Sequence, residues 1–295
     1  MDRKGATEKA ETTPTKPEIS GLLVEGFKSI CQEQQIEIRP LTILAGANSS
    51  GKSSMMQPLL LLKQTLEASY DPGALLLHGP NVRFTSVDQL FSKLPSDSGG
   101  RSACLRVGVQ LSNGNIVRAG FRKGDRQPLE VHETALETKD GTDIISIDAP
   151  FAMPYSTFPP GLCDNLNRAF KEDWQKRAKW RVERNRCFLE AVLELESLAS
   201  RVVEFNPAAC VEAGTRETIH LPGLRGNPER TYPVTSVGPT FPGTFEKYAA
   251  SVVAQWEREE DKERIDGVNR DLARLSLTWK VTARPVDDTQ VELSV

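Results

Sequence analysis

The sequence predicts an α/β fold, and three observations lead to that prediction. An apolar, strand-like run at residues 41–45 leads into a glycine-rich stretch that begins at Gly46, and a helix-forming segment follows. Two short strand-like runs precede it, at residues 21–27 and 36–39, and alternating apolar runs follow from Leu105. We therefore expect an α/β core with a mixed sheet, an antiparallel β-lobe beside it and an inserted helical segment.

The glycine-rich stretch GANSSGKSS matches the GxxxxGK[ST] pattern of a phosphate-binding loop in full. Glycines let the backbone curl so that its N–H groups point at phosphate oxygens, and the start of a helix adds its positive dipole end. Lys52 is expected to reach the β- and γ-phosphates, and the Ser53 hydroxyl to hold Mg²⁺. The alternative is a turn with no ligand. The expected ATP-binding residues are Gly46, Ala47, Asn48, Ser49, Ser50, Gly51, Lys52, Ser53 and Ser54.

Composition favours a cytoplasmic protein. The chain has 295 residues, of which 38% are apolar, and its net charge of −3 gives no overall attraction to nucleic acid. Its five cysteines include no CxxC pair, which is typical of a reducing compartment. The N-terminus is polar and no apolar run is long enough to span a bilayer, so no membrane partner is expected.

The pattern along the chain predicts the order of its parts. Two alternating runs joined at Asn113–Gly114 predict a β-hairpin, and the last twenty residues predict two strands. Apolar residues at helical spacing predict helices at 188–199 and from 245 to about 264, with Thr244 as a helix cap. The expected segments are a tail at 1–18, a P-loop lobe at 19–90, an antiparallel β-lobe at 91–160, a helical insert at 161–275 and returning strands at 276–295.

The motif GFKSI at residues 26–30, followed by a second strand and a loop with asparagine third, resembles the N-terminus of ABC-type ATPases of the SMC, RecF and OLD-like group. Within this group the chain looks closest to bacterial AAA family ATPases. The resemblance implies that Lys28 and Ser29 also lie near the nucleotide.

The resemblance also implies an ATP hydrolase that works as a dimer with a composite site. Its acidic Walker B strand and its signature motif would lie in a C-terminal half. The nearest Walker B candidate in this chain is Asp148, but Ala149 follows it rather than an acid. The nearest signature candidate is the DSGGR string at 97–101, which precedes no helix, and Gln89 is a candidate for the glutamine of the Q-loop. No catalytic residue is assigned. We expect an ATP-binding N-terminal lobe whose partner is a second copy or a chain carrying the C-terminal half.

Two other functions stay open. One is a non-catalytic interaction module whose bound nucleotide acts as a switch for assembly. The other is DNA binding by a basic helix at residues 171–186, in which Trp174 and Trp180 alternate with cations. Such a charged run is also typical of a solvated helix face with inward tryptophans. A small-molecule kinase or GTPase is disfavoured because the sequence has no recognisable lid or guanine-binding motif.

Overall fold

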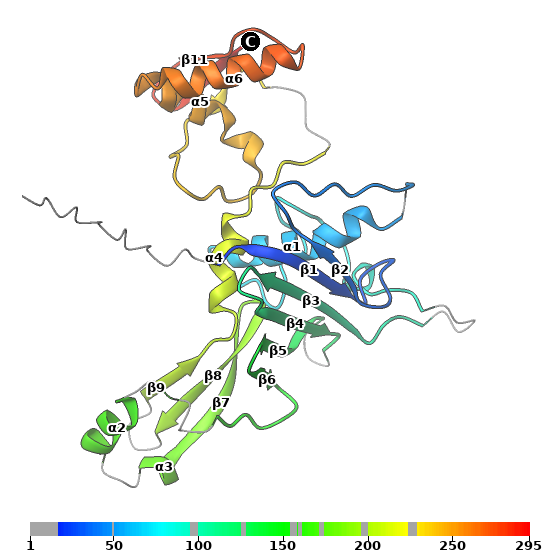
Figure 1. Ribbon diagram of the computed structural model, residues 1–295, viewed down its shortest axis with the longest axis vertical. Coiled ribbons are helices and arrows are strands. Elements are labelled where there is room, and N and C mark those ends of the chain that lie inside the picture. The colour runs from blue at the N-terminus through cyan, green and yellow to red at the C-terminus, as the bar shows by residue number, and fades with distance from the viewer. Residues whose placement is uncertain are drawn as a thin grey trace, which may run out of the picture.

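The computed structural model describes residues 17–48, 50–94, 100–124, 128–153, 158, 161–170, 174–195, 200–223 and 229–295. They form three sheets of six, three and three strands with helices packed against them (Figure 1). Every strand pairing in these sheets is antiparallel. None of the described helices is both long and apolar enough to cross a bilayer.

The predicted α/β P-loop core is therefore wrong, because such a core needs a parallel sheet and none occurs in the part of the chain that the structure describes. Residues 41–45, expected as the strand before the loop, form no strand. Leu41 and Ile43 are 78% and 77% exposed. An apolar run becomes a strand only where a neighbouring strand pairs with its backbone, and no described strand pairs with residues 41–45.

The six-stranded sheet has the order β2-β1-β3-β4-β5-β6. Its strands come both from residues 19–90, expected as the P-loop lobe, and from residues 91–160, expected as a separate β-lobe. The hairpin predicted at Asn113–Gly114 is confirmed, and Gly114 takes the left-handed conformation that the turn requires (φ +89°). The strands are β1 (Ile19–Glu25), β2 (Gln34–Glu37), β3 (Cys104–Leu111), β4 (Ile116–Arg122), β5 (Glu130–Thr138) and β6 (Gly141–Ser146).

Helix α1 (Lys52–Glu67) confirms the predicted helix after the glycine-rich loop and continues through Pro58. Its leucines belong to the same buried cluster as the apolar residues of β1, β3 and β4, so the helix forms part of the main core. Helix α4 (Ala209–Glu217) contacts its other side, and the short 3-10 helix η1 (Val87–Gln89) lies in the connection to β3. The loop at the start of α1 therefore has a rigid support.

The predicted helical insert is wrong over most of its first half. Residues 178–195 and 200–205 contribute a second sheet of three strands, preceded by α2 (Leu162–Phe170) and α3 (Trp174–Arg177). The strands are β7 (Ala178–Asn185), β8 (Phe188–Leu195) and β9 (Ser200–Phe205). In β8 seven of the eight residues are buried and only Glu194 is partly exposed, as in a central strand covered on both faces. A continuous apolar run of this kind also satisfies helical spacing, so periodicity alone misassigns it.

The C-terminal part is a small unit at one end of the molecule, which combines two α-helices with an antiparallel three-stranded sheet (Figure 1). The predicted pair of terminal strands is confirmed, but the helix expected to continue to residue 264 is interrupted. Glu260 has a positive φ of 54°, and the Asp261 side chain accepts from Arg264 N to start a new helix. Thr244 precedes η3 rather than a longer helix. The elements are β10 (Tyr232–Pro233), η3 (Phe245–Lys247), α5 (Ala249–Arg258), α6 (Lys262–Arg274), β11 (Thr282–Pro285) and β12 (Gln290–Ser294).

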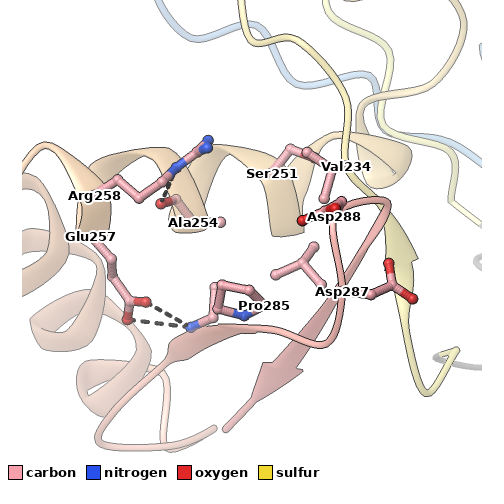
Figure 2. Close-up of a pocket in the computed structure, with 10 residues that line it drawn as sticks. Val234, Ser251, Ala254, Glu257, Arg258, Pro285, Asp287 and Asp288 are labelled. Atoms are coloured by element: carbon pink, nitrogen blue, oxygen red, sulfur yellow. Dashed lines mark hydrogen bonds between the residues drawn. The ribbon is translucent and has the colours of Figure 1, made fainter.

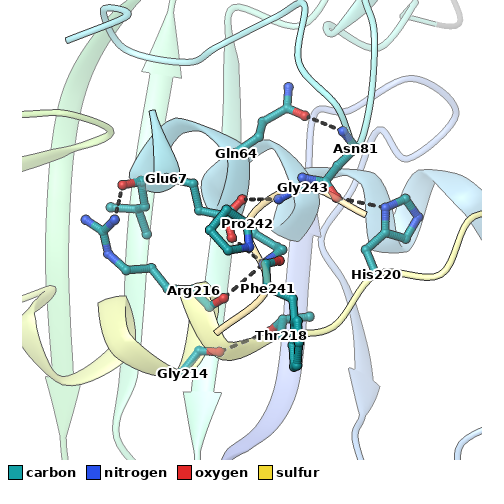
Figure 3. Close-up of polar contacts among 12 residues, drawn as sticks. Gln64, Glu67, Asn81, Gly214, Arg216, Thr218, His220, Phe241, Pro242 and Gly243 are labelled. Atoms are coloured by element: carbon teal, nitrogen blue, oxygen red, sulfur yellow. Dashed lines mark hydrogen bonds and ion pairs between the residues drawn. The ribbon is translucent and has the colours of Figure 1, made fainter. Parts of the chain in front are cut away.

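A buried ion pair fastens α1 to its neighbours. Lys63 is fully buried and pairs with Glu67, which is 9% exposed. The Lys63 ammonium also donates to the carbonyl oxygens of Arg216, at 2.9 Å, and Phe241, at 3.5 Å. Glu67 accepts from the N–H of Gly243 at 3.0 Å (Figure 3). Helix α1, the end of α4 and the segment leading to α5 thus meet at one cluster of charges.

Replacing Lys63 by Met should lower the free energy of unfolding by about 3 kcal/mol or more, because it leaves the Glu67 carboxylate buried without its cation. Lys63→Met/Glu67→Gln should recover part of this loss, since the amide oxygen still accepts from Gly243. Urea denaturation measures both. Exposed Lys280 supplies the matched control, Lys280→Met. If Lys63→Met and Lys280→Met change the free energy of unfolding equally, the buried pair contributes nothing to stability.

A second link joins the turn after α1 to β7 and should make stability depend on pH. Arg184 donates to both carboxylate oxygens of Asp71, at 2.9 and 2.6 Å, and lowers the pKa of Asp71 from 3.8 to about 2. Since the folded-state pKa is the lower one, this stabilisation is present above about pH 4 and is lost as the pH falls toward 2. Asp71 is 57% exposed, so Asp71→Asn should cost about 1 kcal/mol or less at pH 7. Urea denaturation of Asp71→Asn and wild type at several pH values tests this. A difference in their free energies of unfolding that stays constant down to pH 2 contradicts it.

Candidate functional site

The glycine-rich loop ends at the exposed start of α1. Gly51 is the N-cap residue in the left-handed conformation (φ +95°), and no side chain caps the helix. The first helical hydrogen bond runs from Met55 N to Gly51 O at 3.1 Å. The N–H groups of the three preceding residues therefore have no partner within the helix and point out of its N-terminus. Backbone donors and the helix dipole together favour an anion at this position.

Lys52 lies across the loop. Its ammonium donates to the carbonyl oxygens of Gly46 at 2.8 Å and Ala47 at 2.7 Å. An ammonium has three N–H donors, so a third remains for a ligand oxygen. A Cβ at Gly46 would lie 2.8 Å from the Ser50 hydroxyl, which explains the glycine at that end of the loop. The loop therefore holds one cation close to the open donors of α1.

The structure brings Lys28 and Ser29 to this loop from more than twenty residues away. Two backbone hydrogen bonds between Phe27 and Ile30, at 3.0 and 2.8 Å, close a tight turn around them. Within it Lys28 has a positive φ of 50°, which is unfavourable for a residue with a Cβ. The Lys28 ammonium donates to Gln57 Oε1 of α1 at 2.7 Å, and burial lowers its pKa. Gln57 was not predicted from the sequence, although it follows Ser53 by four residues and so shares its helix face.

Two cavities adjoin the loop. One, of about 280 Å³, is lined by Lys28, Ser29 and residues 50–54, so it joins the predicted binding residues from both parts of the sequence. The other, of about 350 Å³, lies between β2, residues 43–45 and the start of α1. No carboxylate lines either cavity among the described residues.

The predicted loop residues differ in their exposure. Gly46, Ala47, Asn48, Ser50 and Ser53 are exposed, whereas Ser54 is buried although it lines the smaller cavity. Ser49 lies outside the described residues. The exposed Ser53 hydroxyl fits a nucleotide-bound Mg²⁺ as a single ligand, and the remaining ligands would come from phosphates and water.

The candidates for catalytic parts do not gather at the loop. Asp148 binds Arg122 through both oxygens, at 2.5 and 3.0 Å, on the six-stranded sheet. Gln89 bonds to Thr85 and lines a neighbouring cavity with Lys28. The string at 97–101 lies largely outside the described residues. No group of three His, Cys, Asp or Glu side chains suited to a metal occurs in the described part of the chain.

The predicted basic helix at 171–186 is also wrong. Its described residues form the short helix α3 and strand β7. Trp174 is fully buried and donates to Asn167 Oδ1 at 2.8 Å, and Trp180 packs edge-on against Phe151. The Trp174 indole is therefore not available to stack on nucleic-acid bases, so this segment does not favour DNA binding.

A separate cavity of about 410 Å³ lies in the C-terminal unit between α5 and the last hairpin (Figure 2). Two of its three acidic side chains already bind the backbone: both oxygens of Glu257 accept from Ala283 N at 3.2 Å, and Asp287 accepts from Thr289. These carboxylates stabilise the hairpin, and we do not take this cavity as the functional site.

The chain matches no model of a known protein family and no curated protein sequence. Its function is therefore argued from the geometry of the loop. The resemblance to ABC-type ATPases stays a prediction that concerns the loop and the GFKSI turn.

Replacing Gly51 by Ala should lower the free energy of unfolding by about 1–2 kcal/mol, because a residue with a Cβ must then adopt the left-handed conformation. The new Cβ would also lie 3.0 Å from the Ser29 hydroxyl. Gly267, inside α6 with open space around its Cα, supplies the contrast: Gly267→Ala should stabilise by about 0.5–1 kcal/mol. Urea denaturation of both variants tests this, and a neutral or stabilising Gly51→Ala would contradict it.

Proposed function

We propose that this protein binds the polyphosphate of a nucleoside triphosphate, ATP with Mg²⁺, at the loop of residues 46–53. One observation carries the proposal: the Lys52 ammonium lies on the loop carbonyls beside a helix start whose N–H groups and dipole have no cap. The full GxxxxGK[ST] match supports the same ligand. Binding does not require the parallel core that is absent from the described residues, because the donors belong to the loop and α1.

Each group has a separate role in the proposed complex. The N–H groups at the start of α1 bind phosphate oxygens. The Lys52 ammonium donates its third N–H to a phosphate oxygen, and its positive charge offsets the charge of the phosphates. Ser53 contributes its hydroxyl to the Mg²⁺ that accompanies the nucleotide. Lys28, which Gln57 holds against α1, adds a second cation at the edge of the same cavity.

The proposed activity of these residues is binding rather than hydrolysis. Among the described residues, the two cavities beside the loop present no carboxylate to activate water or to complete the coordination of Mg²⁺. Hydrolysis would need an acidic group from a second copy or from another chain. A nucleotide that binds without being cleaved is suited to controlling such an association. The five free cysteines agree with a cytoplasmic location, which forms part of this proposal.

Isothermal titration calorimetry of the full chain with ATP and Mg²⁺ tests the proposal. We expect saturable binding of one nucleotide, at least tenfold weaker in Lys52→Ala because a charge-assisted hydrogen bond contributes about 1.5–3 kcal/mol. Ser53→Ala should reduce the effect of Mg²⁺ on affinity and change binding without Mg²⁺ little.

Lys280→Ala is the matched control, since it removes an exposed lysine far from the loop in sequence and outside its cavities. Equal ATP affinity in wild type, Lys52→Ala and Lys280→Ala would refute a functional phosphate loop. Rapid hydrolysis by the wild-type chain alone would contradict the assignment of binding without cleavage.

A further inference from the structure

A basic cavity of about 690 Å³ adjoins the phosphate loop. Its lining includes four cationic residues, Lys28, Arg83, Lys93 and Arg101, and no carboxylate in the described part of the chain. It shares Lys28 and Ser29 with the smaller cavity beside the loop. The two spaces are therefore neighbours on either side of the GFKSI turn.

The cations in this cavity bond to uncharged atoms. Arg83 donates to Gly79 O at 3.4 Å, Arg101 to Phe91 O at 3.1 Å, and Lys28 to Gln57 Oε1. None of the four cations forms an ion pair with a described residue, although Asp88, which pairs with Lys123, lies near Arg101.

The arginines of the six-stranded sheet provide the contrast. Arg106, Arg118 and Arg122 each pair with a carboxylate there. A cluster of like charges that forms no ion pair among the described residues creates a positive potential that attracts anions.

The tertiary structure holds this cluster firmly. A backbone hydrogen bond from Lys28 N to Leu90 O, at 2.8 Å, ties the turn to the segment after η1. Backbone pairing places Lys93 opposite Arg101. The side chains of Arg83, Lys93 and Arg101 are exposed and that of Lys28 is half-buried, yet all four residues are anchored to paired backbone or to the core.

The aromatic residues of the cavity do not suit base stacking. The Lys28 ammonium lies 4.7 Å from the centroid of the Phe84 ring and covers its face, and Phe91 is almost fully buried. A cation over a ring already satisfies the negative face of that ring. Recognition in this cavity therefore depends on charge, and its volume is within the range that accommodates more than a single small ion.

We propose that the basic cavity binds a second phosphate group of the ligand whose polyphosphate occupies the loop. The ligand class is a nucleoside triphosphate that also carries phosphate on its ribose, either as a free nucleotide or as the first internucleotide phosphate of a 5′-triphosphorylated strand. This inference rests on the proposed function. Arg83 and Lys93 bind the additional phosphate, and Lys28 lies between that phosphate and the polyphosphate at the loop.

Calorimetry with three ligands tests the proposal: ATP, adenosine 3′-phosphate 5′-triphosphate and a 5′-triphosphorylated dinucleotide. The additional phosphate should tighten binding to the full chain about tenfold, and Arg83→Gln/Lys93→Gln should abolish that gain while leaving ATP affinity unchanged. Lys280→Gln/Arg284→Gln removes two exposed cations in the C-terminal unit and should keep the gain. Arg101 is left intact because it holds the Phe91 carbonyl. A gain for the nucleotide alone, or for the dinucleotide alone, identifies which form of the ligand fits.

The outcomes separate this inference from the proposed function. If ATP binds and neither additional phosphate tightens binding, or if the gain survives Arg83→Gln/Lys93→Gln, the inference is wrong and nucleotide binding stands. If no nucleotide binds, inorganic pyrophosphate becomes the probe. If pyrophosphate binds to Lys52→Ala but not to Arg83→Gln/Lys93→Gln, the result supports anion binding by the basic cavity alone. If pyrophosphate binds to neither variant, anion binding by the basic cavity is overturned as well.

Discussion

The buried charge of Lys63 is the constraint on which the arrangement of this protein depends. A desolvated ammonium must be surrounded by acceptors, and its acceptors come from α1, from the end of α4 and from the segment that leads to α5. Because Glu67 in turn binds Gly243, these segments can only assemble together. Helix α1 is thereby fastened to α4 and to the segment before α5, and the loop at its other end gains a fixed support.

That support explains how the proposed phosphate loop can exist outside a parallel sheet. The donors proposed to bind phosphate are local to residues 46–54, and they require a helix start held in place rather than any one sheet topology. Here the leucines of α1, buried in the main core, fix the helix axis. The turn around Lys28 then closes one side of the loop, at the cost of a strained backbone conformation. Antiparallel sheets thus provide the rigidity.

Local signals predicted the parts that depend on local geometry. The Asn113–Gly114 turn specified the hairpin β3–β4, and the glycine-rich loop specified where α1 begins. Predictions failed where burial by distant segments decides the structure. The run at residues 188–195 satisfied helical spacing yet became the central strand β8, because β7 and β9 pair with both of its edges. The run at 41–45 stayed outside every sheet because no described strand pairs with it.

The sequence by itself determined the chemistry of the candidate site: Lys52 and Ser53 follow the glycines at fixed spacing, and a helix begins at once. Only the tertiary structure decided the surroundings of that site. Arg83, Lys93 and Arg101 share a cavity with Lys28 although up to 73 residues separate them, and no spacing rule connects such positions. They meet because long-range backbone hydrogen bonds, such as that from Lys28 to Leu90, form only when the whole sheet and core assemble.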